Sequence, residues 1–219
     1  MDTWMVYAIG VLAAYLVGGI PFGFLIGKMR GVDVRTVGSK NIGATNVYRT
    51  VGHKWGFLAF FCDFLKGFVP ALIAVLYVGK AGGDGAALVH LPLSVGFASV
   101  LGHTLTPYMK FKGGKGVATA FGMLMALATI PVLMAFAVFV VTVWLSHYIS
   151  LGSCLAAATI AALVWVLPAT LPDSVLGWCF PAAVTLLFQI LVTLLGVFVI
   201  YKHKSNIKRL IDGCENKIY

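Results

Sequence analysis

The run from Gly116 to Pro172 contains no Asp, Glu, Lys or Arg, and this constrains the fold more than any other feature of the sequence. A helix that crosses a bilayer needs about 20 mostly apolar residues. The run is therefore long enough for nearly three crossings. Breaks at 129–131 and at 150–152, where Pro131 and Gly152 interrupt the apolar pattern, divide it into three short spans.

Four more apolar stretches complete the pattern. They are Thr3–Gly27, Trp55–Gly79, Gly85–Met109 and Ser174–Tyr201. With 60% hydrophobic and only 11% charged residues, the composition excludes an ordinary soluble globule. The sequence therefore predicts an all-α integral membrane protein with seven transmembrane helices, built as a single domain over residues 1–219.

The basic residues predict the orientation, because cytoplasmic loops are enriched in Lys and Arg. With the N-terminus outside and the C-terminus cytoplasmic, 14 of the 16 Lys and Arg residues fall on the inner side and only Lys80 falls outside. An even number of spans would place segment 28–54 and the tail from 202 on opposite sides. The formal charge of +9 lies in short blocks between apolar runs, which favours anionic headgroups or small phosphorylated ligands over nucleic acid.

The first polar segment on the inner side, residues 38–49, is suited to binding a phosphate. Its small residues allow the backbone to bend closely around a ligand, and Arg49 supplies a forked cation. Neutral hydrogen-bonding groups come from Ser39, Asn41, Thr45 and Asn46. The alternative, a polar turn whose side chains only cap helices, stays open at this point.

The second segment, residues 102–116, leads straight into an apolar helix. Gly113, Gly114 and Gly116 surround Lys115 at the predicted helix start, where backbone N–H groups and the helix dipole favour an anion. The pattern is not a Walker A loop, because Gly116 follows the lysine in place of Ser or Thr. A juxtamembrane turn anchored by lysines is the alternative.

The third segment, residues 202–213, predicts an interfacial helix with its basic residues toward water. Ile207, Leu210 and Ile211 recur at helical spacing. His203 and Asn206 lie beside this apolar stripe, so we expect both side chains to face the protein.

Two charges interrupt the span Trp55–Gly79. Asp63 and Lys66 are three residues apart, so they can neutralise each other on one helix face. Because charge inside a membrane is costly, a functional role and a structural ion pair both stay open.

Taken together, the three segments resemble the bacterial acyl-phosphate:glycerol-3-phosphate acyltransferases. Residues 38–49, 102–119 and 203–217 match the three motifs of that family. Lys40 departs from the common form of the first motif, which has glycine there. The resemblance implies important roles for Ser39, Asn46, Arg49, Gly113, Gly114, Lys115, Gly116, His203, Asn206 and Glu215. Taking the chemistry of the residues into account as well, we expect catalytic roles for Ser39, Arg49, Lys115, His203 and Asn206. We expect substrate or phosphate binding by Asn41, Thr45, Asn46, Gly113, Gly114 and Gly116, and structural support from Asp63, Lys66 and Glu215.

The resemblance also implies the reaction. Acyl phosphate would donate its acyl group to glycerol 3-phosphate, giving lysophosphatidic acid and phosphate at the start of phospholipid synthesis. An acyl phosphate is already activated, so we expect direct transfer without an acyl-enzyme, with the proton accepted by His203 or by the leaving phosphate. We expect no cofactor and no metal, since the inner segments lack paired carboxylates and a His/Cys cluster.

The expected setting is a monomer among membrane lipids of the bacterial inner membrane, with its active site on the cytoplasmic side and no nucleic acid as partner. A phosphate or organic-anion transporter is the main alternative, because it too would use helix N-termini and basic residues. A transporter, however, predicts polar groups at mid-membrane, whereas the distinctive groups here lie at the inner boundary. A membrane phosphotransferase would need an Asp-rich metal site.

Overall fold

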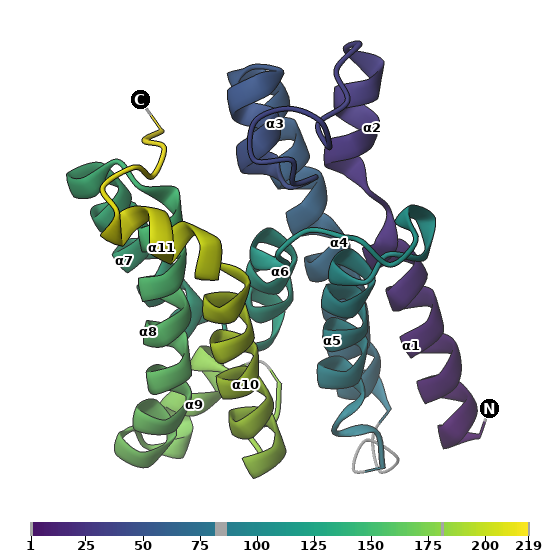
Figure 1. Cartoon of the computed structure of the whole chain (residues 1–219). Helices are drawn as coiled ribbons and strands as arrows, with labels where there is room; N and C mark the ends of the chain where they lie inside the picture. Colours follow the sequence, from purple (N-terminus) through teal and green to yellow (C-terminus); the bar gives the residue numbers. More distant parts are fainter. Residues whose placement is uncertain (1, 82–86, 181, 219) are drawn as a thin grey trace. The chain divides into compact units, whose positions relative to one another are not determined.

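Helices form every regular element in this computed structural model, which describes residues 2–81, 87–180 and 182–218. The chain divides into two compact units, Met1–Leu127 and Ala128–Tyr219, whose helices are labelled in Figure 1. The prediction of an all-α protein is confirmed for the described part of the chain.

The first unit is built around α4. Within it α1 packs on α5, and α4 contacts α1, α2, α3, α5 and α6. The elements of this unit are α1 (Thr3–Gly19), α2 (Phe22–Met29), α3 (Ala44–Thr50), α4 (His53–Lys80), α5 (Leu91–Thr104), the 3-10 turn η2 (Pro107–Met109) and α6 (Val117–Leu127).

Glycines allow α4 and α6 to approach backbone to backbone. A Cβ atom on Gly67 of α4 would overlap the carbonyl of Thr119, and a Cβ on Gly122 of α6 would overlap the carbonyl of Phe64. Each helix thus contributes one glycine to the same crossing. Small residues allow such close packing between membrane helices, where lipid supplies no hydrophobic force to drive association.

The break between α1 and α2 is stabilised by polar side chains from other helices. Pro21 has no N–H group to continue the helix, so carbonyls at the end of α1 lose their partners. The Gly19 carbonyl accepts a hydrogen bond from Thr106 Oγ1 at 2.6 Å, and the Ile20 carbonyl accepts one from Lys66 Nζ at 2.8 Å. Both side chains are buried, and together they satisfy the broken helix end.

The second unit packs α8 against α7, α10 and α11, with α9 against α7. Its helices are α7 (Thr129–Ser146), α8 (Ile149–Thr170), α9 (Asp173–Cys179), α10 (Leu186–Lys202) and α11 (Lys204–Ile211). The predicted break at 129–131 is close to the start of α7, which follows the non-helical residue Ala128. The second predicted break was placed too late, because α7 ends and α8 begins around His147, whose φ of 64° is left-handed.

Ser150 and Gly152, which motivated that second break, lie instead in the first turns of α8. Ser150 bonds to a buried glutamate, and Gly152 lies against Phe139 and Val143 of α7. Ser150 therefore serves hydrogen bonding, and Gly152, which has no side chain, allows close packing within a continuing helix.

The predicted span Ser174–Tyr201 is also corrected. Its first part is the separate short helix α9, and α10 begins only at Leu186, where Thr185 Oγ1 caps the helix by accepting the N–H of Phe188 at 3.1 Å. The predicted span Gly85–Met109 corresponds to α5, and residues 85 and 86 lie outside the described residues.

Among the described residues, four helical segments are long and apolar enough to cross a bilayer: Thr3–Met29, α4, α7 and α8. A fifth is present if α10 and α11, which meet at a bend of 54°, count as one span. With 14 and 11 residues, α5 and α6 are about 21 Å and 16 Å long, against about 30 Å for a hydrocarbon core. The count of seven crossings therefore stays a prediction.

Replacing Gly67 with leucine tests the close crossing of α4 and α6. We expect the Gly67→Leu variant to lose about 1–3 kcal/mol of stability or more, because the helices must separate to admit the side chain. Gly79→Leu on the same helix is the matched control, since nothing lies within 4 Å of a Cβ there. Thermal unfolding in detergent measures both. Equal unfolding temperatures for the two variants would contradict the crossing.

Candidate active site

The first segment is organised by the buried side chain of Asn46, which is 2% exposed. Its Nδ2 donates to the carbonyls of Val34 at 2.8 Å and Asn41 at 2.9 Å, and its Oδ1 accepts the N–H of Ser39 at 2.9 Å. One side chain thus ties together residues before and after the turn. The side-chain amide of Asn46 therefore shapes this loop. Binding a substrate would require the same Oδ1 and Nδ2 atoms.

The loop has the backbone shape that its glycines suggest, with one exception. Gly38 has a φ of 57°, and a Cβ there would overlap Asn46 Oδ1. Lys40 has a φ of 56°, so it occupies a left-handed position that favours glycine. This is the position at which the sequence departs from the common form of the motif. Lys40 therefore adopts the conformation that glycine would have there.

The other side chains of the first segment lie around α3. Asn41 Oδ1 accepts the N–H of Gly43 at 2.8 Å, which sets the turn immediately before the helix. Thr45 and Arg49 are half-buried on α3, and Ser39 is exposed in the preceding loop. Asn41 and Asn46 thus hold the loop through their side chains.

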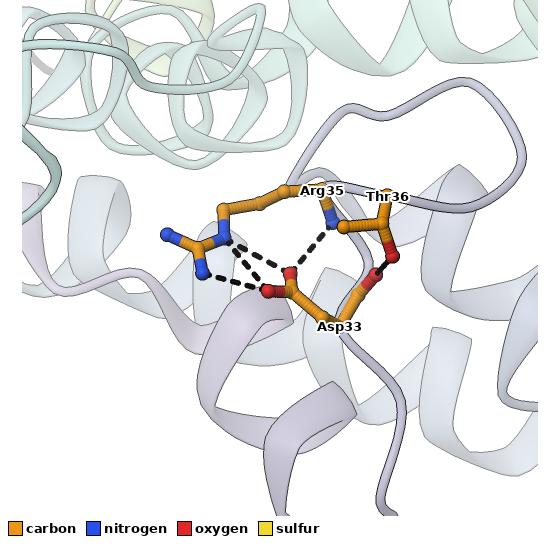
Figure 2. A network of polar contacts seen from close by, with 3 residues as sticks. All are labelled: Asp33, Arg35 and Thr36. Carbon is orange, nitrogen blue, oxygen red and sulfur yellow. Dashed lines mark hydrogen bonds and ion pairs between the residues drawn. The ribbon is translucent and has the colours of Figure 1, made fainter.

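Arg35, just before the first segment, pairs with Asp33, as Figure 2 shows. Its Nη2 bonds to Asp33 Oδ2 at 2.7 Å, and its guanidinium lies 4.5 Å from the ring centre of Phe24. Hydrogen bonds from the side chain and backbone of Arg35 lower the pKa of Asp33 to about 2. This exposed pair orders the turn locally, and an exposed pair adds little stability.

The second segment folds back on the end of α5. The N–H of Gly113 donates to the carbonyl of Thr104 at 3.2 Å, and the N–H of Gly114 donates to the carbonyl of His103 at 3.1 Å. Beyond them Gly116, with a φ of 83°, accepts the N–H of Ala120 at 2.8 Å and begins α6. The N–H groups of Gly113 and Gly114 are therefore already bonded within the protein.

Lys115 lies directly before that helix start and is half-buried. The first N–H groups of an α-helix have no partner within the helix, and they carry the positive end of its dipole. A cation and a helix N-terminus thus come together in the second segment. This arrangement suits a phosphate group.

Asp63 and Lys66 form a buried ion pair beside the second segment. Lys66 Nζ lies 2.8 Å from Asp63 Oδ1, and both side chains are 2% exposed. His103 Nδ1 approaches the same carboxylate oxygen at 3.6 Å. The structure thus supports the interpretation of an ion pair on one helix face, with a third partner from α5.

The third segment centres on Glu215, which is 7% exposed. Its Oε1 accepts hydrogen bonds from Asn206 Nδ2 at 2.7 Å and Ser150 Oγ at 3.1 Å, and its Oε2 accepts one from Arg209 Nε at 2.7 Å. Burial by itself would raise the pKa of Glu215, but the hydrogen bonds from Asn206, Arg209 and Ser150 outweigh it and hold that pKa below its usual value. Glu215 therefore fixes Asn206 and connects α11 to α8.

His203 stands at the bend between α10 and α11 and is 3% exposed. Its Nδ1 lies 2.8 Å from the carbonyl of Val199. A carbonyl only accepts, so Nδ1 is the donor in this contact. The prediction that His203 and Asn206 face the protein is confirmed. Ile211, at 81% exposure, points away from it.

The two units hold different parts of the predicted site. The first unit contains Ser39, Arg49 and Lys115 with the loops around them, and the second contains His203, Asn206 and Glu215. Sequence reasoning assigned no role to His103, Ser150 or Arg209. Ser150 contacts a residue 65 positions away, for which the sequence holds no signal. For His103 the sequence did hold a signal, because the charged pair Asp63 and Lys66 inside an apolar span calls for a third polar partner.

Comparison with known proteins bears on this arrangement. The glycerol-3-phosphate acyltransferase family profile matches residues 8–213. The chain is 44% identical over 207 residues to the glycerol-3-phosphate acyltransferase of Aquifex aeolicus (strain VF5), covering 94% of this chain and 96% of that one. The enzyme of the same name from Trichlorobacter lovleyi is also 44% identical, covering 94% and 95%.

Two solved structures are similar over nearly the whole chain. Both are crystal structures of PlsY, an integral membrane glycerol 3-phosphate acyltransferase, each covering 96% of this chain and 94% of its own. The glycerol 3-phosphate form has a TM-score of 0.77 at 42% identity, and the lysophosphatidic acid form has 0.74 at 41%. This chain belongs to the glycerol-3-phosphate acyltransferase family.

Proposed function

We propose that this protein transfers an acyl group from acyl phosphate to glycerol 3-phosphate, giving lysophosphatidic acid and inorganic phosphate. The observation that carries this proposal is the second segment, where Lys115 stands at the start of α6 behind a backbone fixed to α5. The chain is an acyltransferase by family, and similar PlsY structures have been solved in glycerol 3-phosphate and lysophosphatidic acid forms. These are the acceptor and the product of the proposed reaction.

The proposed reaction uses all three segments in one domain, residues 1–219. Lys115 and the first N–H groups of α6 hold one phosphate group. The other residues proposed to act on the reactants are Ser39 and Arg49 in the first unit, and His203 and Asn206 in the second. Glu215, Asp63 and Lys66 support the site through the contacts described above.

The chemical step needs no covalent intermediate. The hydroxyl oxygen of glycerol 3-phosphate attacks the carbonyl carbon, the bond between that carbon and the phosphate oxygen breaks, and phosphate departs with the electron pair. The hydroxyl proton passes to His203 Nε2 or to the departing phosphate. The positively charged side chains of Lys115 and Arg49 stabilise the negative charge that develops as phosphate leaves.

The proposed setting is a bacterial inner membrane crossed seven times. Apolar helices account for seven segments: α1 with α2, α4, α5, α6, α7, α8 and α10. With seven crossings the two termini lie on opposite sides of the membrane, and the positions of the basic residues favour an N-terminus outside and three polar segments on the cytoplasmic side. The working unit is proposed to be a monomer that takes its donor from the surrounding lipid and uses no metal or cofactor.

An assay of the purified protein tests the donor. We expect lysophosphatidic acid to form from acyl phosphate and glycerol 3-phosphate, and the rate to be unchanged by a chelator. Acyl-CoA and acyl carrier protein thioesters serve as competing donors in parallel reactions. Turnover confined to the thioesters would overturn the donor assignment.

Replacing His203 with asparagine tests the proton acceptor. Asparagine retains a donor near the Nδ1 position toward the Val199 carbonyl but removes Nε2. If His203 is the base, kcat falls about 100-fold while the unfolding temperature holds. We expect this fall, measured in initial rates with both substrates saturating. Full turnover in His203→Asn would leave the departing phosphate as the proton acceptor.

Acid should destabilise the second unit through Glu215. Because its folded pKa is depressed, its contribution to stability is present above the unfolded pKa of about 4 and is lost as pH falls through the folded pKa. We expect the unfolding temperature to fall below about pH 4, and Glu215→Gln to weaken this dependence. Thermal unfolding across pH measures it, with Glu215→Gln as the matched variant. An unchanged acid dependence would contradict the role given to Glu215.

A further inference from the structure

His103 is buried under the second segment and is not used by the reaction as proposed above. It is 5% exposed at the end of α5, with Nδ1 facing the Asp63 carboxylate at 3.6 Å. Asp63 in turn pairs with Lys66, which donates to the Ile20 carbonyl. Placing an acid, a base and an imidazole in an apolar interior is costly, so their retention calls for a role beyond stability.

The opposite side of the imidazole lies against Gly114. A Cβ added to Gly114 would overlap His103 Nε2, and the other two nearest atoms are also atoms of that ring, at 2.9 Å and 3.2 Å. The backbone of Gly114 bonds to the His103 carbonyl as well. His103 therefore holds Gly114 with both its side chain and its backbone.

Gly114 is a glycine because of this ring and not because of its own backbone. Positive φ values occur among the described glycines at Gly31, Gly38, Gly52, Gly116 and Gly213, and Gly114 is not one of them. Alanine would be compatible with its backbone if the imidazole were absent. Gly116 is the opposite case, since its φ of 83° favours glycine whatever lies nearby.

We propose that His103, oriented by the Asp63–Lys66 ion pair, is a positioning residue that sets the place of Gly114 and so of Lys115 at the start of α6. Asp63 fixes the ring from one side, and the ring supports the glycine from the other. Only Lys115 lies between Gly114 and Gly116, whose carbonyl accepts a backbone hydrogen bond from the first turn of α6. Any displacement of Gly114 therefore shifts the phosphate-binding cation that follows it. The inference rests on the proposed function of that segment.

A double-mutant cycle tests the contact. His103→Asn keeps a nitrogen toward Asp63 but leaves space where Nε2 and Cε1 stood. We expect His103→Asn to lower kcat/KM about tenfold through KM, and Gly114→Ala to lower it about 100-fold. The double variant is expected to be at least about tenfold more active than Gly114→Ala, because the added Cβ then has room.

Gly116→Ala is the matched control, since its defect arises from φ and His103→Asn should not relieve it. Calorimetric titration with inorganic phosphate gives a readout without turnover: we expect weaker phosphate binding by His103→Asn at an unchanged unfolding temperature. A purely structural role would move the unfolding temperature and leave phosphate affinity alone.

Two results would overturn the proposal: unchanged phosphate affinity in His103→Asn, whatever happens to its kcat/KM, or a double variant no more active than Gly114→Ala. Failure of the unmodified protein to turn over acyl phosphate would count against the proposed function instead. The phosphate titration and the comparison of variants separate these two failures.

Discussion

The pairing of the Gly113 and Gly114 N–H groups with the last carbonyls of α5 is the interaction on which the site depends. Backbone groups at a membrane boundary need partners, and these two bonds satisfy the end of α5 and the glycine loop together. They also use both glycine N–H groups within the protein. The glycines shape the loop, whereas Lys115 and the start of α6 present positive charge.

The first and third polar segments are organised in the same way, each by one buried side chain that bonds to several partners. Asn46 does this for the first segment, and Glu215 does it for the third. Buried polar groups that are fully bonded hold one conformation, because any rearrangement leaves a group unpaired. The residues proposed to bind substrate stand beside these organising side chains. Rigid support and ligand contact are thus divided between neighbouring residues.

Periodicity and charge predicted much of the architecture. The apolar runs located the helices, and the spacing of His203 and Asn206 in the third segment predicted their inward faces. Helix ends were less well predicted: Ser150 and Gly152 indicated a break, but they serve packing and a hydrogen bond to Glu215 within α8. Local sequence does not reveal a partner 65 residues away.

The candidate site was predictable where its residues share a local pattern. The glycine loop and the third segment were found in this way, and the match to the acyltransferase family extends over residues 8–213. The organising role of Asn46 was not predicted, because an asparagine that shapes a loop and one that binds a ligand look alike in sequence. The contact of His103 with Gly114 depends on how α5 meets the loop, which only the tertiary structure reveals.

The central claim is that the glycine loop, with Lys115 at the start of α6, binds the phosphate of glycerol 3-phosphate. Photo-crosslinking with a diazirine analogue of glycerol 3-phosphate, followed by peptide mapping, tests this most directly. The account predicts adducts within residues 113–119 that are suppressed by excess glycerol 3-phosphate. Absence of competable adducts from these residues would contradict it.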